Sequence, residues 1–139
     1  MSRAFEPPPG RQVFARTFDP KLTDIDENGH VNNVVYLAWA QDIAIAHWRA
    51  RAAAADNDSF AWVALRHEID YRRPLVLSET ARARTWVADH ADGPRFERYV
   101  RIDGPNGAMC AQVLTVWCLV EKASGRPRRV PEPLVAMFC

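Results

Sequence analysis

Acidic, amide and imidazole side chains crowd the stretch "TDIDENGHVNN", which runs from Thr23 to Asn33. Asp26, Asn28 and His30 follow one another at every second position. A carboxylate can attack a carbonyl carbon or deprotonate a water molecule, an amide can orient that water, and an imidazole can transfer a proton. The stretch is therefore a candidate catalytic site, although an isolated D-x-D pattern often serves only as loop and capping residues.

A long helix is expected directly after this stretch, from about Asn32 to about Ala55. Asn32 or Asn33 can act as its N-cap, and "DNDS", Asp56 to Ser59, is expected to end it. Its apolar residues fall on nearly all sides, which predicts that other elements surround it.

Five segments have the residue pattern of β-strands, namely Gln12–Phe18, Phe60–Arg73, Glu79–Asp89, Arg95–Ile102 and Met109–Val120. The turns "ADGP" and "GPNG" are short, so we expect a mainly antiparallel sheet. The last segment is apolar at both odd and even positions, which predicts a central strand covered on both faces. The order of strand, helix and four strands predicts an α+β fold, with one curled sheet of about five strands wrapped around a long central helix.

Length, charge and cysteine content narrow the class of protein. The chain has 139 residues, which suits one domain, and its formal net charge of +1 does not indicate a nucleic-acid-binding protein. Gln41, Asp42 and His47 interrupt the longest apolar run, so no membrane span is expected. Three cysteines without a secretory signal predict a reducing, cytoplasmic location. No metal is expected, because D-x-D-x-N-x-H lacks the glycine and the distant glutamate of a calcium loop.

The segment from Asp24 to Trp39 has the pattern D-x-D-x-N-x-H-V-N-N-x-x-Y-x-x-W, and "EIDYRRP" follows at Glu68 to Pro74. Both resemble the hotdog-fold thioesterases, in particular the branch with hydroxybenzoyl-coenzyme A thioesterase and the acyl-carrier-protein thioesterases. The resemblance extends from about Gln12 to Leu134. It implies a hotdog domain over residues 11–139, and the proline-rich residues 1–10 are expected to form a flexible tail. It also implies hydrolysis of an acyl-coenzyme A (acyl-CoA) to a carboxylic acid and CoA, without a cofactor because CoA is part of the substrate.

The same resemblance implies roles for individual residues. Asp26 falls on the catalytic carboxylate of the family, and Asn28 and His30 match the residues that accompany it. Asn33 falls where a backbone N–H at the helix start is aimed at the thioester carbonyl. The helix start has unpaired N–H groups and the positive end of the helix dipole, so the backbone groups of residues 31–34 are the expected oxyanion donors.

Further assignments concern the surroundings of the site. The phosphates of CoA need cations near the mouth of the site, and the candidates are Arg72, Arg73 and Arg128. Asp42 takes the place of an acidic residue that is common on the central helix of the family, and it is either a second acid near the site or the partner of an arginine. His67 is interpreted as a structural histidine.

Two alternatives to acyl-CoA hydrolysis remain open. An acyl-carrier-protein thioesterase is favoured by Asn28 and His30, but Pro74 stands where the plant enzymes of that group have a further acid. A non-catalytic acyl-thioester-binding or sensor protein would not need Asp26. A homodimer or homotetramer is expected with either reading, since one sheet leaves part of the helix and an edge strand open. A tetramer would cover outward-facing residues such as Phe60 and Trp62.

Overall fold

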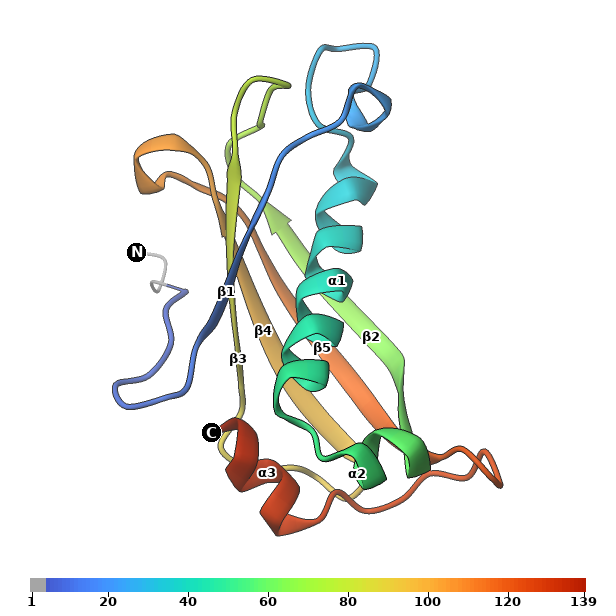
Figure 1. Cartoon of the computed structure of the whole chain (residues 1–139). Coiled ribbons are helices and arrows are strands. Elements are labelled where there is room, and N and C mark those ends of the chain that lie inside the picture. Colours follow the sequence, from blue (N-terminus) through green and yellow to red (C-terminus); the bar gives the residue numbers. More distant parts are fainter. Residues whose placement is uncertain (1–4) are drawn as a thin grey trace.

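The computed structural model describes residues 5–139 and consists of one sheet and one long helix that crosses it (Figure 1). All strand pairs are antiparallel, and the strand order is β1-β3-β4-β5-β2. The strands are β1 (Phe14–Phe18), β2 (Phe60–Tyr71), β3 (Ala81–Val87), β4 (Arg95–Asp103) and β5 (Met109–Glu121). Helix α1 (Asn33–Arg51) lies on the inner face of the curled sheet. The predicted α+β architecture of the hotdog type is confirmed.

Helix α1 packs on the sheet through one face only. Its buried side chains recur at intervals of three and four residues, namely Tyr36, Trp39, Ala40, Ile43, Ala44, His47 and Trp48. On the opposite face Val34 is 68% exposed and Ile45 is 42% exposed. The curled sheet therefore covers one side of the helix and leaves the other side open in the single protomer, so burial on nearly all sides is not seen within residues 5–139.

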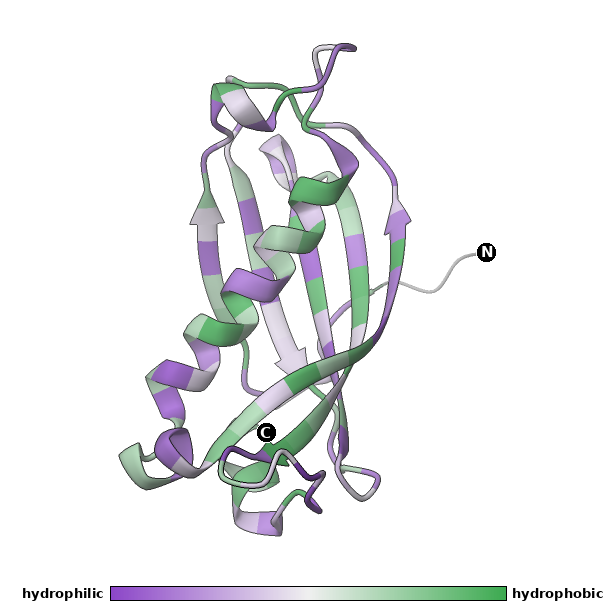
Figure 2. Ribbon diagram, turned by 90° about the vertical axis from the view of Figure 1, so that its right-hand side faces the viewer, coloured by the Kyte–Doolittle hydropathy of each residue, from purple (hydrophilic) through white to green (hydrophobic). Residues whose placement is uncertain are grey.

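The ends of α1 follow its capping residues. Asn32 is the N-cap, and its Oδ1 accepts a hydrogen bond of 3.2 Å from the N–H of Val34. The helix ends at Arg51, earlier than expected, and a second short helix α2 (Ala54–Ser59) contains the "DNDS" segment. Polar and apolar residues alternate along the strands behind α1, as Figure 2 shows.

A β-bulge in β2 determines which of its side chains face the helix. The register with β5 shifts between Ala64 and Arg66, so Leu65 is an extra residue in the strand. Before the bulge Trp62 faces inward, and its ring lies 5.8 Å from that of Trp48. Val63 and Leu65 are 48% and 50% exposed. The expectation that Phe60 and Trp62 face outward was wrong, since both are half-buried.

The outer face of the sheet is only partly covered. Strand β5 lies between β4 and β2, but its outward residues Leu114 and Val116 are half-buried, so the expected cover on both faces is incomplete in the protomer. The Phe5 ring packs on this face, 5.5 Å from the ring of Trp86. Phe5 belongs to the predicted tail at residues 1–10, of which residues 1–4 lie outside those described. The division into tail and domain stays a prediction.

The two ends of the sheet carry different elements. The β1–α1 loop and the β2–β3 loop meet at one end, where the N–H of Val31 donates to the carbonyl oxygen of Leu75 over 2.8 Å. Helices α2 and α3 (Glu132–Phe138) lie at the other end (Figure 1). Within residues 5–139, no helix is both long and apolar enough to cross a membrane.

Candidate active site

A cavity of about 320 Å³ opens between the β1–α1 loop, the start of α1 and the end of β2. Its lining contains all the site residues expected from the sequence except Arg128, namely Asp26, Asn28, His30, Asn33, Arg72 and Arg73. Two segments that are distant in the chain therefore form one site. Their catalytic and binding roles stay predictions at this point.

The Asp26 side chain is held by its own loop. Its Oδ1 accepts hydrogen bonds from the N–H groups of Asn28, at 2.9 Å, and His30, at 3.3 Å. The N–H of Asp26 in turn donates to the carbonyl oxygen of His30 over 2.8 Å, and Gly29 makes the turn with a φ of +79°. Nothing in residues 5–139 donates to the second carboxylate oxygen, Oδ2. Asp26 is thus positioned by one oxygen, which leaves the other for chemistry.

Most N–H groups at the helix start already have acceptors. The N–H of Val31 donates to Leu75, that of Asn32 donates to the carbonyl oxygen of Asp24 over 2.8 Å, and that of Val34 donates to its N-cap. In the described chain only the N–H of Asn33, among residues 31–34, has no acceptor. The predicted set of four oxyanion donors was therefore too wide, and it reduces to Asn33.

The side chains of Asn28 and His30 are exposed at the cavity. Neither side chain has a hydrogen-bond partner within residues 5–139, so both are available to a substrate or to water. Their contribution to the loop itself is made through the backbone, as donors to Asp26.

Two tyrosines and a cysteine also line the cavity, and the sequence analysis gave none of them a role. The Tyr71 hydroxyl donates to the carbonyl oxygen of Asn33 over 2.9 Å, and the Tyr36 hydroxyl accepts from the N–H of Leu75 over 3.1 Å. Burial raises the pKa of both phenols, so they are protonated at neutral pH. Both tyrosines lie in the two motifs quoted above, and no other feature of the sequence indicated that they line the cavity.

Cys110 is not suited to be the nucleophile of this cavity. Burial raises the pKa of its thiol to about 11, so the reactive thiolate is scarce at neutral pH. All three cysteines are free, and Cys110 and Cys118 are buried.

The candidate cations differ in their surroundings. The N–H of Arg72 donates to the carbonyl oxygen of Cys110 over 2.8 Å, while its side chain is exposed. Arg73 lies 3.4 Å from the carboxylate of Glu79. Arg128 lies apart from this cavity, where it pairs with Glu121 at 2.8 Å and covers the Phe60 ring. The structure therefore brings two of the three candidate cations to the site.

Asp42 and His67 lie away from the cavity. Asp42 is exposed on the outer face of α1 and forms no ion pair within residues 5–139, so neither of the roles considered for it is seen in the protomer. The Nδ1 atom of His67 is 2.8 Å from the hydroxyl of Thr115, as expected for a structural histidine. Among the described residues, no three His, Cys, Asp or Glu side chains are arranged to hold a metal ion.

A sequence model of the thioesterase-like superfamily matches residues 20–138. The chain belongs to the thioesterase-like superfamily. This membership, together with the fold, supports a thioester hydrolase. A comparison of this chain with curated proteins found no match.

Solved structures agree with the assignment over nearly the whole chain. A thioesterase from Thermus thermophilus, complexed with coenzyme A and zinc, is 25% identical, with a TM-score of 0.78 and coverage of 93% of this chain and 98% of that one. A 1,4-dihydroxy-2-naphthoyl-CoA thioesterase from Synechocystis is 16% identical, with the same TM-score and coverage of 92% and 96%. A Staphylococcus aureus protein in complex with CoA is also 16% identical, with a TM-score of 0.78 and coverage of 98% and 85%. The last two likenesses show the fold.

Proposed function

We propose that this protein hydrolyses an acyl-CoA thioester to a carboxylic acid and free CoA. The observation that carries the proposal is the shared cavity, which gathers the carboxylate of Asp26, the unpaired N–H of Asn33 and the cations Arg72 and Arg73. The CoA bound by the similar proteins from Thermus thermophilus and Staphylococcus aureus gives further support.

The reaction requires a stabilised oxyanion and an activated nucleophile. The thioester carbonyl oxygen accepts a hydrogen bond from the N–H of Asn33, at the positive end of the α1 dipole, and one such donor is typically worth about 2.7–4 kcal/mol. Asp26 either attacks the carbonyl carbon or takes a proton from the attacking water. The carbon–sulfur bond then breaks, and the CoA sulfur receives a proton. Where Asp26 is the nucleophile, water then hydrolyses the acyl–Asp26 anhydride, which gives the acid and restores the carboxylate. Asn28 orients the water or the carboxylate, and His30 transfers the proton.

The phosphates of CoA are assigned to the arginine pair at the end of β2. Arg72 has an exposed guanidinium beside the cavity, and Arg73 adds a second cation that it shares with Glu79. Guanidinium groups suit phosphate because they donate two parallel hydrogen bonds.

A second copy of the chain completes the site in this proposal. Strand β2 is an edge strand with exposed apolar side chains at Val63 and Leu65, and Tyr71 at its end lines the cavity. Two β2 edges can pair in antiparallel fashion and hide these groups. We propose a homodimer. The argument for a tetramer was that it would cover outward-facing Phe60 and Trp62, and it no longer holds because both residues are half-buried. A cytoplasmic location is proposed as well, since the three cysteines are free.

One assay separates the three candidate functions. Thiol release is measured from a panel of acyl-CoA substrates and from acyl carrier protein loaded with the same acyl groups, next to calorimetric binding of a non-hydrolysable thioether analogue. We expect turnover of free acyl-CoA. Turnover with the carrier protein alone would favour the carrier-protein enzyme. Tight binding of the analogue without thiol release from any substrate would favour a binding or sensor protein.

A further inference from the structure

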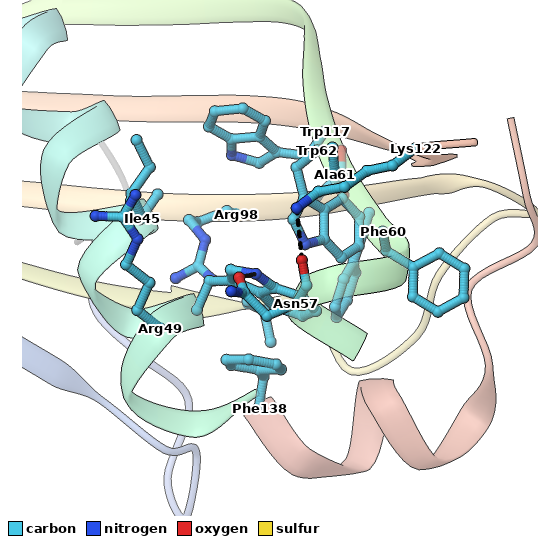
Figure 3. A pocket seen from close by; sticks show the side chains of 15 residues that line it. Ile45, Arg49, Asn57, Phe60, Ala61, Trp62, Arg98, Trp117, Lys122 and Phe138 are labelled. Carbon is cyan, nitrogen blue, oxygen red and sulfur yellow. Dashed lines mark hydrogen bonds between the residues drawn. The ribbon is translucent and has the colours of Figure 1, made fainter. Parts of the chain in front are cut away.

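A second cavity, of about 250 Å³, lies at the other end of α1, between that helix, the first residues of β2 and β4, and helix α3 (Figure 3). Aromatic side chains dominate its wall, among them Trp48, Trp62, Phe96 and Phe138. Because α1 rises about 1.5 Å per residue, Trp48 lies roughly 22 Å along the helix from Asn33. Within one protomer this cavity is separate from that of Asp26.

A buried arginine stands in the wall of this aromatic cavity. Arg98 projects from the inner face of β4 and is 9% exposed. Its Nη1 donates to the hydroxyl of Thr85 over 3.0 Å and lies 3.0 Å from the Nδ1 atom of His47. No carboxylate of residues 5–139 forms an ion pair with it. A buried charge without an opposite charge is costly, so the site favours an anion from outside the chain.

The neighbours of Arg98 do not neutralise it. Burial and the charge of Arg98 lower the pKa of His47 to about 3, so the imidazole is neutral at pH 7. Its Nδ1 accepts from Arg98, and its Nε2–H donates to Oε1 of Gln12 over 2.8 Å. Burial lowers the pKa of Arg98 only to about 10, so the guanidinium keeps its charge. Of its N–H groups, those on Nη2 and Nε have no acceptor within residues 5–139.

Two further donors belong to residues of the same wall. The indole Nε1–H of Trp117 is buried without a hydrogen-bond partner in the described chain, and Trp117 also lines the aromatic cavity. Lys122, whose Nζ donates to the carbonyl oxygen of Asn57 over 2.6 Å, adds positive charge at the wall (Figure 3). Buried charged donors are normally paired, so the free N–H groups of Arg98 beside the cavity indicate a missing acceptor.

We propose that the aromatic cavity binds an organic carboxylate with a compact apolar body, whose oxygens pair with the free N–H groups of Arg98. The aromatic wall covers the apolar body, and Arg98 selects the anion. A cavity of about 150 Å³ can hold a benzene molecule, so the volume of about 250 Å³ has room for a small aromatic acid. The proposal does not depend on the thioesterase reaction.

The carboxylate has two possible sources with the same chemistry. It is either a free acid or the far end of an acyl group bound by a partner. Antiparallel pairing of two β2 strands would bring the Phe60 end of one strand beside the Tyr71 end of the other, and these residues line the two different cavities. The test therefore includes both sources.

The first test is calorimetric binding of benzoate, 2-naphthoate and hexanoate to the full-length protein, each compared with its neutral amide. We expect the better-fitting acids to bind at least about tenfold more tightly than their amides. Arg98→Met keeps much of the side-chain volume and should abolish this preference. Arg95→Met is the matched control, because Arg95 is an exposed arginine of β4 outside the cavity lining.

The second test compares acyl-CoA substrates that end in a carboxylate with those that end in a methyl group. If the carboxylate belongs to the acyl group, Arg98→Met lowers kcat/KM only for the first kind. If it is a free acid, the acids bind but the two kinds of substrate respond equally to the variant.

Three results would overturn the proposal. The first is equal affinity of wild type for acids and amides. The second is an acid preference that survives in folded Arg98→Met. The third is dissociation of the oligomer in Arg98→Met, which would indicate that a second copy supplies the carboxylate. If Arg98→Met does not fold, the acid-to-amide affinity ratio of wild type decides.

Discussion

The hydroxyl of Tyr71 donates a hydrogen bond of 2.9 Å to the backbone carbonyl oxygen of Asn33. This bond joins the end of the edge strand β2 to the first residue of α1, whose own N–H is the proposed oxyanion donor. The ring of Tyr71 also packs against that of Tyr36, at 5.7 Å. The position of the helix start therefore depends on a strand that the proposed dimer would cover.

Tyr71→Phe removes this bond and keeps the ring. A hydrogen bond of this kind contributes about 0.5–1.5 kcal/mol, so we expect kcat for thiol release to fall roughly twofold to tenfold. Steady-state kinetics with the best acyl-CoA substrate provide the measurement. Tyr99→Phe is the control, because the Tyr99 hydroxyl contacts Glu97 and lies outside the Asp26 cavity. An equal loss in both variants would argue against a role of the Tyr71 bond.

His47 should make the protein less stable in weak acid. Its pKa is about 3 in the folded state and near 6.5 in the unfolded chain, so between these values the unfolded chain binds more protons. The contribution of neutral His47 to the free energy of unfolding is complete above pH 6.5. It is lost as pH falls toward 3, at a slope that approaches roughly 1.4 kcal/mol per pH unit. Arg98 and Arg51 both oppose protonation, and no described carboxylate pairs with the ring.

The pH effect is measured by urea unfolding at pH 7 and pH 5, for wild type and for His47→Gln. The other titrating groups are common to both proteins, so the difference between their pH dependences isolates His47. Between pH 7 and pH 5, the free energy of unfolding of wild type should fall by on the order of 1–2 kcal/mol more than that of His47→Gln. Equal losses would contradict the assignment of a neutral, buried imidazole.

Assembly is predicted to depend on the exposed edge of β2. Leu65→Lys places a charge in the bulge of that strand, where a paired strand would have to bury it, so we expect a monomer at micromolar concentration. Val13→Lys is the control, because Val13 is exposed next to β1, at the opposite edge of the sheet. Light scattering reports the mass of each protein. A dimer that persists in Leu65→Lys, or a monomeric wild type, would reject pairing through β2.

The fold was predictable because its signals are local. Strand positions followed from residue types and short turns, and the helix start followed from Asn32 at the N-cap. The bulge at Leu65 was not predictable, since nothing in "FAWVALRHEIDY" marks an extra residue. That single residue reverses which side chains face inward, and it explains the error at Trp62.

The candidate site was predictable as a set of residues and not as a geometry. The motif placed Asp26, Asn28 and His30 on one loop, but the reduction of the oxyanion donors to Asn33 depends on acceptors such as Leu75, which is distant in sequence. No sequence pattern indicated the aromatic cavity. Arg98 lies in "RFERYVRI" among other arginines, and only the pairing of β4 with its neighbours turns it inward.

The central claim is tested most directly by thiol release from acyl-CoA by Asp26→Asn and Glu27→Gln. The asparagine keeps an oxygen that can accept from the N–H groups of Asn28 and His30 but lacks the charge, whereas Glu27 is the exposed neighbouring acid outside the cavity lining. We expect Asp26→Asn to lower kcat at least about a hundredfold and Glu27→Gln to leave kcat unchanged. A folded Asp26→Asn protein with near-wild-type turnover would contradict the proposed mechanism.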